Sequence, residues 1–349
     1  MGLLGPLPHP HDHKTAADPA PTVATRALPF PSLQALVISN MAASKSQPER
    51  GSFVRTQVAA LRQLPGLEVE LFEFPPGARA LAKAAATLLW RYRGHRFDVV
   101  HAHFGLAAWP ALCVSARVRA LTLHGSELAY RRTRLATQAV LPLIDLPAAA
   151  SAELAEAAPP ARRPYAILPC GVDLQRLVPK PRPLARQRLG LPLGEPYLLF
   201  PADPRRPEKR YDRALALAGR LDCKLLVFGG IPPERVVDYY NAANAVVIPS
   251  EREGFGLAAL EGLACNLPVA ATPVGNHPHA LAGLESALCA PFDLESWAAF
   301  LRPYLEAEER RPTTRDRAAA YSAVAMAEQV ADRWREAVAQ AEQNWHQGG

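Results

Sequence analysis

The chain has 349 residues and a mass of 37.8 kDa, enough for two domains that each bury their own core. Charged residues make up 21% and hydrophobic residues 49%, and no run approaches the ~20 apolar residues that cross a bilayer, so an integral membrane protein is excluded. The net charge of +6 suits an anionic partner, but the basic residues are dispersed and no nucleic-acid motif is present. We therefore expect a nucleotide as partner and no nucleic acid.

The cysteines and the first residues bear on location. Five widely spaced cysteines without a Cys-x-x-Cys pair indicate a reducing compartment and buried thiols, so we expect a cytoplasmic protein. Residues 1–32 are rich in Pro and Ala and show no periodicity, which predicts a disordered leader. They lack the basic start and the apolar core of a signal peptide.

Ordered structure is expected to begin at Leu33, where an apolar run predicts a buried strand. A loop then passes Gly51 and enters a helix near Ser52. Residues 67–74 alternate as a second strand, and residues 78–97 have the pattern of a helix with basic residues among apolar ones. A basic amphipathic helix can lie on anionic lipid, although a solvated face over a core stripe explains the same pattern.

The next strands end in histidines. Residues 97–104 predict a strand that contains His101 and His103, and a further strand ends at His124. His124 lies just beyond the carboxyl end of its strand, where ligands sit in open α/β sheets. Residues 33–178 therefore form a first domain, and the Pro-Lys-Pro-Arg-Pro run at 179–183 predicts a stiff linker.

A second domain is predicted over residues 184–320. Its first strand, Tyr197 to Phe200, leads into a cationic loop and then a helix near Tyr211. The cations of the loop are Arg205, Arg206, Lys209 and Arg210. Another strand and a short helix follow before residue 246.

The stretch from Val246 to His279 predicts a strand, a glycine loop, a helix from Leu257 to Cys265, a second strand and a second glycine turn. The first amides of a helix are unpaired and carry the positive end of its dipole, so such a loop suits a diphosphate. Glu253 and Glu261 lie on either side of the loop and could each accept hydrogen bonds from sugar hydroxyls. Two hydroxyl-rich ends that flank a diphosphate describe a nucleotide sugar.

The segment SEREGFGLAALEGLACNLPVAATPVGNHP, residues 250–278, resembles the donor-site signature of retaining glycosyltransferases of family 4 (group 1), which have the GT-B fold. The resemblance implies an α/β protein with two Rossmann-like, doubly wound domains facing a central cleft. It also implies that the helical residues 321–349 cross back to the first domain.

The resemblance assigns roles residue by residue. Glu253 would face the transferred sugar, Glu261 would hold the ribose, and His124 would approach the sugar. Lys209 would cover the departing diphosphate together with an arginine. Pro204 stands where relatives have that arginine, so Arg205 or Arg206 must serve. The backbone that holds the donor would come from Gly51, Gly254, Phe255, Gly256 and Leu257.

Three departures leave parts of this assignment open. Glu127 stands where an aspartate is commoner, and Cys170 replaces the usual asparagine. Two strands and a helix that relatives have after the equivalent of Gly230 are missing, so the base of the nucleotide cannot be named.

The resulting hypothesis is a retaining, metal-independent glycosyltransferase without a cofactor. It would move a sugar from a nucleoside-diphosphate sugar to a saccharide or lipid-linked acceptor, in exopolysaccharide, cell-envelope or glycolipid assembly. Contact with the inner face of the membrane is a further candidate property. A sugar-nucleotide epimerase or a phosphorylase on the same fold, or a non-catalytic nucleotide-sugar-binding protein, remain the alternatives.

Overall fold

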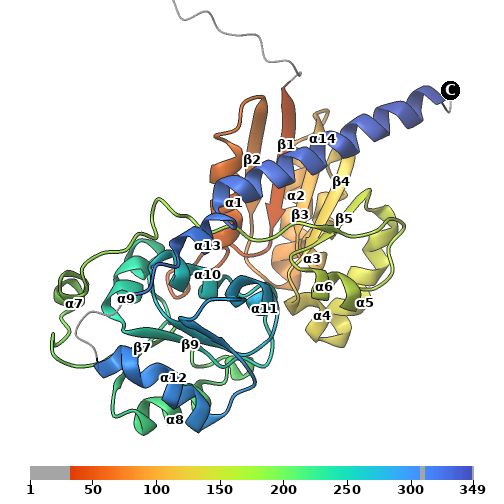
Figure 1. Cartoon of the computed structure of the whole chain (residues 1–349). Helices are drawn as coiled ribbons and strands as arrows, with labels where there is room; N and C mark the ends of the chain where they lie inside the picture. The colour runs from red at the N-terminus through yellow and green to blue at the C-terminus, as the bar shows by residue number, and fades with distance from the viewer. Residues whose placement is uncertain (1–31, 307–310, 348–349) are drawn as a thin grey trace, which may run out of the picture. The chain divides into compact units, whose positions relative to one another are not determined.

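A computed structural model describes residues 32–306 and 311–347 of the chain. Within these residues two separate parallel β-sheets form, one of six strands and one of five (Figure 1). The leader predicted over residues 1–32 falls, except for Ser32, outside the described residues. Each sheet is covered by helices on both faces, as parallel sheets require.

The first sheet has the strand order β2-β1-β3-β4-β5-β6. Alternate residues of β1 enter different cores, because successive side chains of a strand point to opposite faces. Ala35 and Val37 pack toward α1 (Ser52–Leu61) and α14 (Ala323–Gln347), whereas Leu36 and Ile38 pack toward α2 (Ala78–Arg91) and α3 (Gly105–Ala111). The strands are β1 (Leu33–Ser39), β2 (Leu67–Glu73), β3 (Arg96–His103), β4 (Ser115–Leu123), β5 (Leu146–Ala149) and β6 (Ala166–Ile167). The helices are α1 (Ser52–Leu61), α2 (Ala78–Arg91), α3 (Gly105–Ala111), α4 (Ser126–Ala129), α5 (Arg131–Val140) and α6 (Ala152–Ala157).

The second sheet has the order β11-β10-β9-β7-β8 and shows the same alternation. Val246 and Ile248 of β9 pack with α9 and α10 on one face, and Val247 packs with α8 and α12 on the other. Its strands are β7 (Tyr197–Phe200), β8 (Lys224–Val227), β9 (Ala245–Ile248), β10 (Val269–Ala271) and β11 (Ala287–Cys289). Its helices are α7 (Arg182–Leu189), α8 (Tyr211–Arg220), α9 (Val236–Ala242), α10 (Leu257–Ala264), α11 (His277–Leu281) and α12 (Leu294–Glu306).

One predicted boundary is wrong. The helix expected over residues 78–97 ends at Arg91, because Gly94 has a φ of 77° and the chain then enters β3 at Arg96. The linker is predicted over residues 179–183, and α7 begins within that range, at Arg182. Pro183 fits the first turn of that helix, where a missing N–H costs nothing.

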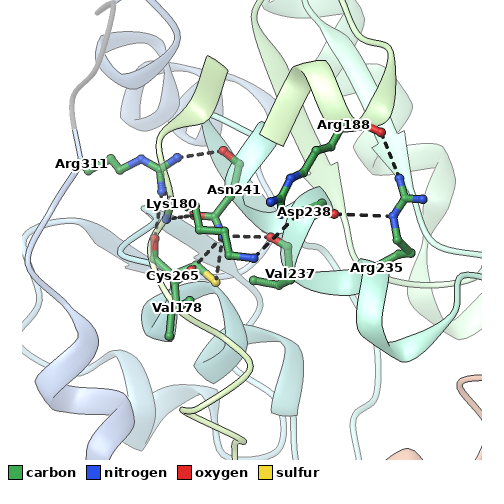
Figure 2. A network of polar contacts seen from close by, with 9 residues as sticks. All are labelled: Val178, Lys180, Arg188, Arg235, Val237, Asp238, Asn241, Cys265 and Arg311. Carbon is green, nitrogen blue, oxygen red and sulfur yellow. Dashed lines mark hydrogen bonds and ion pairs between the residues drawn. The ribbon is translucent and has the colours of Figure 1, made fainter. Parts of the chain in front are cut away.

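The linker is fixed to the second domain by polar contacts (Figure 2). The main-chain N–H of Lys180 donates to Asn241 Oδ1 over 2.7 Å, and Asn241 Nδ2 donates to the carbonyl of Val178 over 2.9 Å. Asp238 is buried and lies 3.4 Å from Arg188 and 3.9 Å from the Lys180 ammonium. One buried carboxylate on α9 thus attracts cations from the linker and from α7.

The last two helices pack on different domains, α13 (Arg315–Ala319) on the second and α14 on the first (Figure 1). Helix α13 contacts α10, and α14 contacts α1, β3 and β4. Trp334 of α14 is fully buried, and its indole N–H donates to His101 Nδ1 over 3.2 Å. Among the helices of residues 32–306 and 311–347, none is both long and apolar enough to cross a membrane.

Candidate active site

The second sheet reverses its strand order between β9 and β7, and the loops that leave these strands meet at one edge. The loop after β7 carries Lys209, at the end of a short 3₁₀ helix (Pro207–Lys209), and the loop after β9 carries Glu253. The Lys209 ammonium lies 2.5 Å from Glu253 Oε2 although the two residues are 44 apart in the chain. The topology therefore brings together Lys209, which is predicted to cover the departing diphosphate, and Glu253, which is predicted to face the transferred sugar.

Glu253 is a shielded carboxylate whose side chain is 9% exposed. Besides Lys209 it accepts a hydrogen bond of 2.7 Å from the Ser250 hydroxyl. Burial raises its pKa, but the electrostatic interactions with Lys209 and His277 and the hydrogen bonds from Lys209 and Ser250 outweigh burial and hold the pKa below the ordinary value. The group is ionised at neutral pH and has a fixed orientation.

The glycine turn beside Glu253 has the geometry that the motif predicts. Gly256 precedes α10 with a φ of 92°, a left-handed conformation that favours glycine, and no side chain caps the helix. The first amides of α10 are thus left to a ligand. Gly254 is needed for another reason, since a Cβ there would lie 1.9 Å from the main-chain oxygen of His124.

Glu261 lies on α10 and is partly buried. Its Oε2 accepts a hydrogen bond of 2.8 Å from the hydroxyl of Tyr240 on α9. Burial raises the pKa of Glu261, whereas the Tyr240 hydroxyl and the charge of Arg176 lower it, and burial prevails. The carboxylate keeps one oxygen for a second hydrogen bond, as a ribose contact would need.

His124 follows β4 directly, and its main-chain N–H donates to Glu127 Oε1 over 2.9 Å. Its Nε2 lies 2.9 Å from His103 Nδ1, and the two rings stack. Burial, with a smaller effect of His101, lowers the pKa of His124 to about 3. The ring is therefore neutral at pH 7 and can act through hydrogen bonds but not as a cation.

A cavity of about 390 Å³ brings residues of both domains together. His124 and Gly125 line it from the first domain, and Arg206, Glu253 and Gly254 from the second. Lys209 is hydrogen-bonded to Glu253, one of the residues that line the cavity. A second cavity of about 300 Å³, between α1, residues 172–176 and the start of α14, contains none of the predicted catalytic residues.

The two candidate arginines are placed differently. Arg206 lines the cavity and pairs with Glu208 at 2.7 Å. Arg205 is 74% exposed and pairs with Asp203 at 2.7 Å, outside the residues that line the cavity. The structure thus brings Arg206 to the site, and it does not bring Arg205 there.

Gly51, the donor-binding residue predicted before α1, and its neighbour Arg55 both have structural partners. Gly51 has a φ of 70°, and a Cβ there would lie 2.3 Å from the Met41 oxygen, so the turn requires glycine. Arg55 pairs with Glu73 at 3.0 Å and donates to the Arg50 oxygen at 2.7 Å. Phe255 is buried and Leu257 starts α10, so both contribute backbone to the turn.

Sequence reasoning missed Ser250, Tyr240 and His277, which hold the two glutamates and the glycine turn. Ser250 lies three residues before Glu253, but a serine at the end of a buried strand is only a weak indication of a hydrogen bond to that glutamate. Tyr240 and His277 reach the site from other elements, which spacing along the chain cannot reveal. Among the residues that the structure describes, no cluster of three or more His, Cys, Asp or Glu is arranged to hold a metal ion.

Comparison with known proteins identifies relatives. The family model described as glycosyl transferases group 1 matches residues 185–321. A D-inositol 3-phosphate glycosyltransferase from Streptosporangium roseum is 30% identical over 304 residues, which cover 70% of this chain and 68% of the relative. For three other relatives of that name the matched stretches span 43%, 41% and 65% of the relative, less than two thirds of its length.

Solved structures share the fold. The sucrose-phosphate synthase of Thermosynechococcus elongatus superimposes with a TM-score of 0.69 at 19% identity, over 88% of this chain and all of that chain. Anabaena Alr3699/HepE in complex with UDP and glucose gives a TM-score of 0.62 at 17% identity, over 87% and 100% of the two chains. These similarities confirm the predicted GT-B fold with its two Rossmann-like domains. Through the relative from Streptosporangium roseum and the family model, the chain belongs to the group 1 glycosyltransferases.

Proposed function

We propose that the protein is a retaining glycosyltransferase of family 4 that moves a sugar from a nucleoside-diphosphate sugar to an acceptor hydroxyl. The observation that carries the proposal is the Lys209–Glu253 pair beside the Gly254–Gly256 turn, in contact with a cavity that His124 lines from the other domain. A diphosphate donor also agrees with the UDP and glucose in the Anabaena structure.

The leaving group of the proposed reaction is the nucleoside diphosphate. When the bond between the anomeric carbon and the diphosphate breaks, negative charge develops on the phosphate. The free amides at the start of α10 and the cations of Lys209 and Arg206 would stabilise that charge. Because these groups supply positive charge without a metal ion, we propose metal-independent catalysis that needs no cofactor.

Glu253 and His124 would contact the transferred sugar. Glu253 is ionised and can accept hydrogen bonds from sugar hydroxyls, while a neutral His124 can donate one from a ring nitrogen. Neither group needs to attack the anomeric carbon. The acceptor hydroxyl would approach on the face that the diphosphate leaves, so the configuration is retained.

Lys209→Ala tests this proposal. Loss of one group that stabilises the leaving phosphate is expected to lower donor turnover by at least about tenfold, and up to about 10³-fold. Turnover is measured as nucleotide release from UDP-, GDP- and ADP-sugars, with circular dichroism to verify the fold. Lys224→Ala is the matched control, since Lys224 is an exposed lysine of β8 in the same domain. Normal turnover in a folded Lys209→Ala variant would refute the assigned role.

The acceptor is proposed to be a saccharide or a lipid-linked molecule of exopolysaccharide, cell-envelope or glycolipid assembly, met at the inner face of the membrane in the cytoplasm. The supporting feature is the outer side of α2, where Leu89 is 60% and Trp90 82% exposed. Arg79, Lys83 and Arg93 are exposed on or beside the same helix. Apolar side chains among cations suit an anionic lipid surface. D-inositol 3-phosphate is the first soluble acceptor to test, because a relative is named D-inositol 3-phosphate glycosyltransferase.

Vesicle sedimentation tests the membrane contact. The protein should bind vesicles that contain phosphatidylglycerol more strongly than pure phosphatidylcholine vesicles, because the exposed cations attract anionic lipid. Trp90→Ala should weaken this binding at least about threefold. The control is Trp345→Ala, which removes another exposed tryptophan, at the end of α14. Equal vesicle binding by the wild type and both variants would contradict a membrane contact through α2.

A further inference from the structure

A buried imidazole lies directly beneath the glycine turn. His277 opens α11, is 0% exposed, and its Nδ1 lies 2.9 Å from the main-chain oxygen of Thr272. A carbonyl oxygen only accepts, so Nδ1 carries the hydrogen and Nε2 of the neutral ring presents a lone pair. That Nε2 has no hydrogen-bond partner.

The unpartnered nitrogen points at the phosphate-binding turn. A Cβ added at Gly256 would lie 2.5 Å from His277 Nε2, so the ring edge packs against the residue that precedes α10. The main-chain N–H of Asn276 donates to the Phe255 oxygen over 2.8 Å and ties the two glycine turns together. A buried nitrogen without a partner is costly and calls for an explanation in function.

The charges around the ring come from three elements. Glu253 beside the turn and Glu153 on α6 favour a protonated His277, and Lys209 from the loop after β7 disfavours it. Burial dominates and lowers the pKa of His277 in the free protein. In the free protein the Lys209 ammonium is hydrogen-bonded to Glu253, so the Glu253 carboxylate already has a counter-charge.

Donor binding would change this balance. If a diphosphate draws Lys209 away, Glu253 loses its counter-charge while a new anion settles on the other side of Gly256. Both changes favour a cation at His277, because a nearby negative charge raises the pKa of a base such as imidazole. The proton comes from solvent and binds to Nε2, and no other bond is made or broken.

We propose that His277 takes up a proton when the donor binds, so that an imidazolium beneath Gly256 replaces Lys209 as the partner charge of Glu253. His277 is then a positioning residue, because it acts through Glu253 and the glycine turn. The inference rests on the proposed donor site.

Calorimetry measures this proton directly. UDP-glucose, with GDP-mannose and ADP-glucose as alternatives, is titrated in buffers that differ in ionisation enthalpy. Sugar diphosphates are the right probes because a free terminal phosphate itself titrates near pH 6. At pH about 7 the wild-type protein should take up a substantial fraction of one proton per donor, and uptake should vanish by about pH 9. His277→Gln should abolish the uptake, and His279→Gln, an exposed histidine two residues away, should keep it.

The outcomes separate the two proposals. Donor binding without proton uptake in the wild type, or uptake that persists in His277→Gln, overturns the role of His277 and leaves the donor site intact. Absence of binding by all three sugars overturns the donor site and this inference with it. Imidazole ¹⁵N NMR of the wild type gives a second reading that needs no variant: Nε2 of His277 should gain a proton on donor binding, and an unchanged signal contradicts the proposal.

Discussion

At the scale of single residues, Glu253 and Glu261 have different partners, which agrees with the different roles that we propose for them. Glu253 pairs with a cation and stays ionised, whereas Glu261 shares a hydrogen bond with a neutral phenol. The first arrangement suits a group beside a developing charge, and the second suits a ground-state contact with a hydroxyl. Substitution of Glu261 should therefore affect binding more than chemistry.

Glu261→Ala is expected to weaken donor binding. A hydrogen bond to a charged group contributes about 1.5–3 kcal/mol, which corresponds to a rise in Kd of about 10- to 150-fold. Titration calorimetry with a nucleotide sugar measures the change. Glu285→Ala, which removes an exposed glutamate of the same domain, should leave Kd unchanged. An unaltered Kd for Glu261→Ala would remove its assignment to the ribose.

Part of this residue pattern could be predicted from the sequence, because the motif fixes Glu253, Glu261 and the glycines by their spacing. The pairing of Lys209 with Glu253 could not be predicted, since 44 residues separate them, and family resemblance gave each residue only a separate role. The sequence could not distinguish Arg206 from Arg205, because the two are adjacent arginines and only the geometry of the loop separates them. The Tyr240–Glu261 bond and the place of His277 come from tertiary packing alone.

At the scale of elements, the glycine turn before α10 is the point where the two domains come closest at the site. The added Cβ at Gly254 would meet the main-chain oxygen of His124, and a backbone atom cannot swing aside as a flexible side chain can. Gly254, in the loop after β9, and His124, after β4, thus approach closely because Gly254 has no side chain. If catalysis uses both Glu253 and His124, as we propose, it depends on this contact.

Gly254→Ala should separate the turn from His124. We expect donor turnover to fall by at least about tenfold, because small displacements of positioned groups are costly, and the free energy of unfolding to fall by about 1–3 kcal/mol. Nucleotide release and urea denaturation measure the two effects. Gly219→Ala is the control: Gly219 lies in α8 with open space around its Cα, so alanine should stabilise that helix by about 1 kcal/mol. A Gly254→Ala variant that matches wild type in both assays would contradict the close approach.

Element boundaries show where prediction from sequence stops. The strand, glycine turn and helix around residues 246–264 were predicted correctly, because apolar runs and glycines mark them clearly. The end of α2 was placed six residues too late, since the apolar pattern runs on through Tyr92 and Phe97 into β3. Periodicity could not separate the end of the helix from the start of the strand, whereas the positive φ of Gly94 does.

At the scale of the whole molecule, the site exists because two sheets present the carboxyl ends of their strands to one cavity. His124 follows β4 of one sheet and Glu253 follows β9 of the other, and both line a space of about 390 Å³. A sugar held there would touch both domains at once. A non-catalytic binder would need only the second domain, so groups from both domains favour transfer over simple binding.

The stereochemical course of donor turnover tests transfer by this site most directly. Proton NMR follows an α-linked nucleoside-diphosphate sugar with water or inositol 3-phosphate as acceptor, in wild-type protein and in Lys209→Ala. The wild type should release nucleoside diphosphate and form the α-anomeric product first, and Lys209→Ala should do so at least about tenfold more slowly. A β-anomeric first product, epimerised donor without nucleotide release, or equal rates in the two proteins would contradict a retaining transferase built on Lys209 and Glu253.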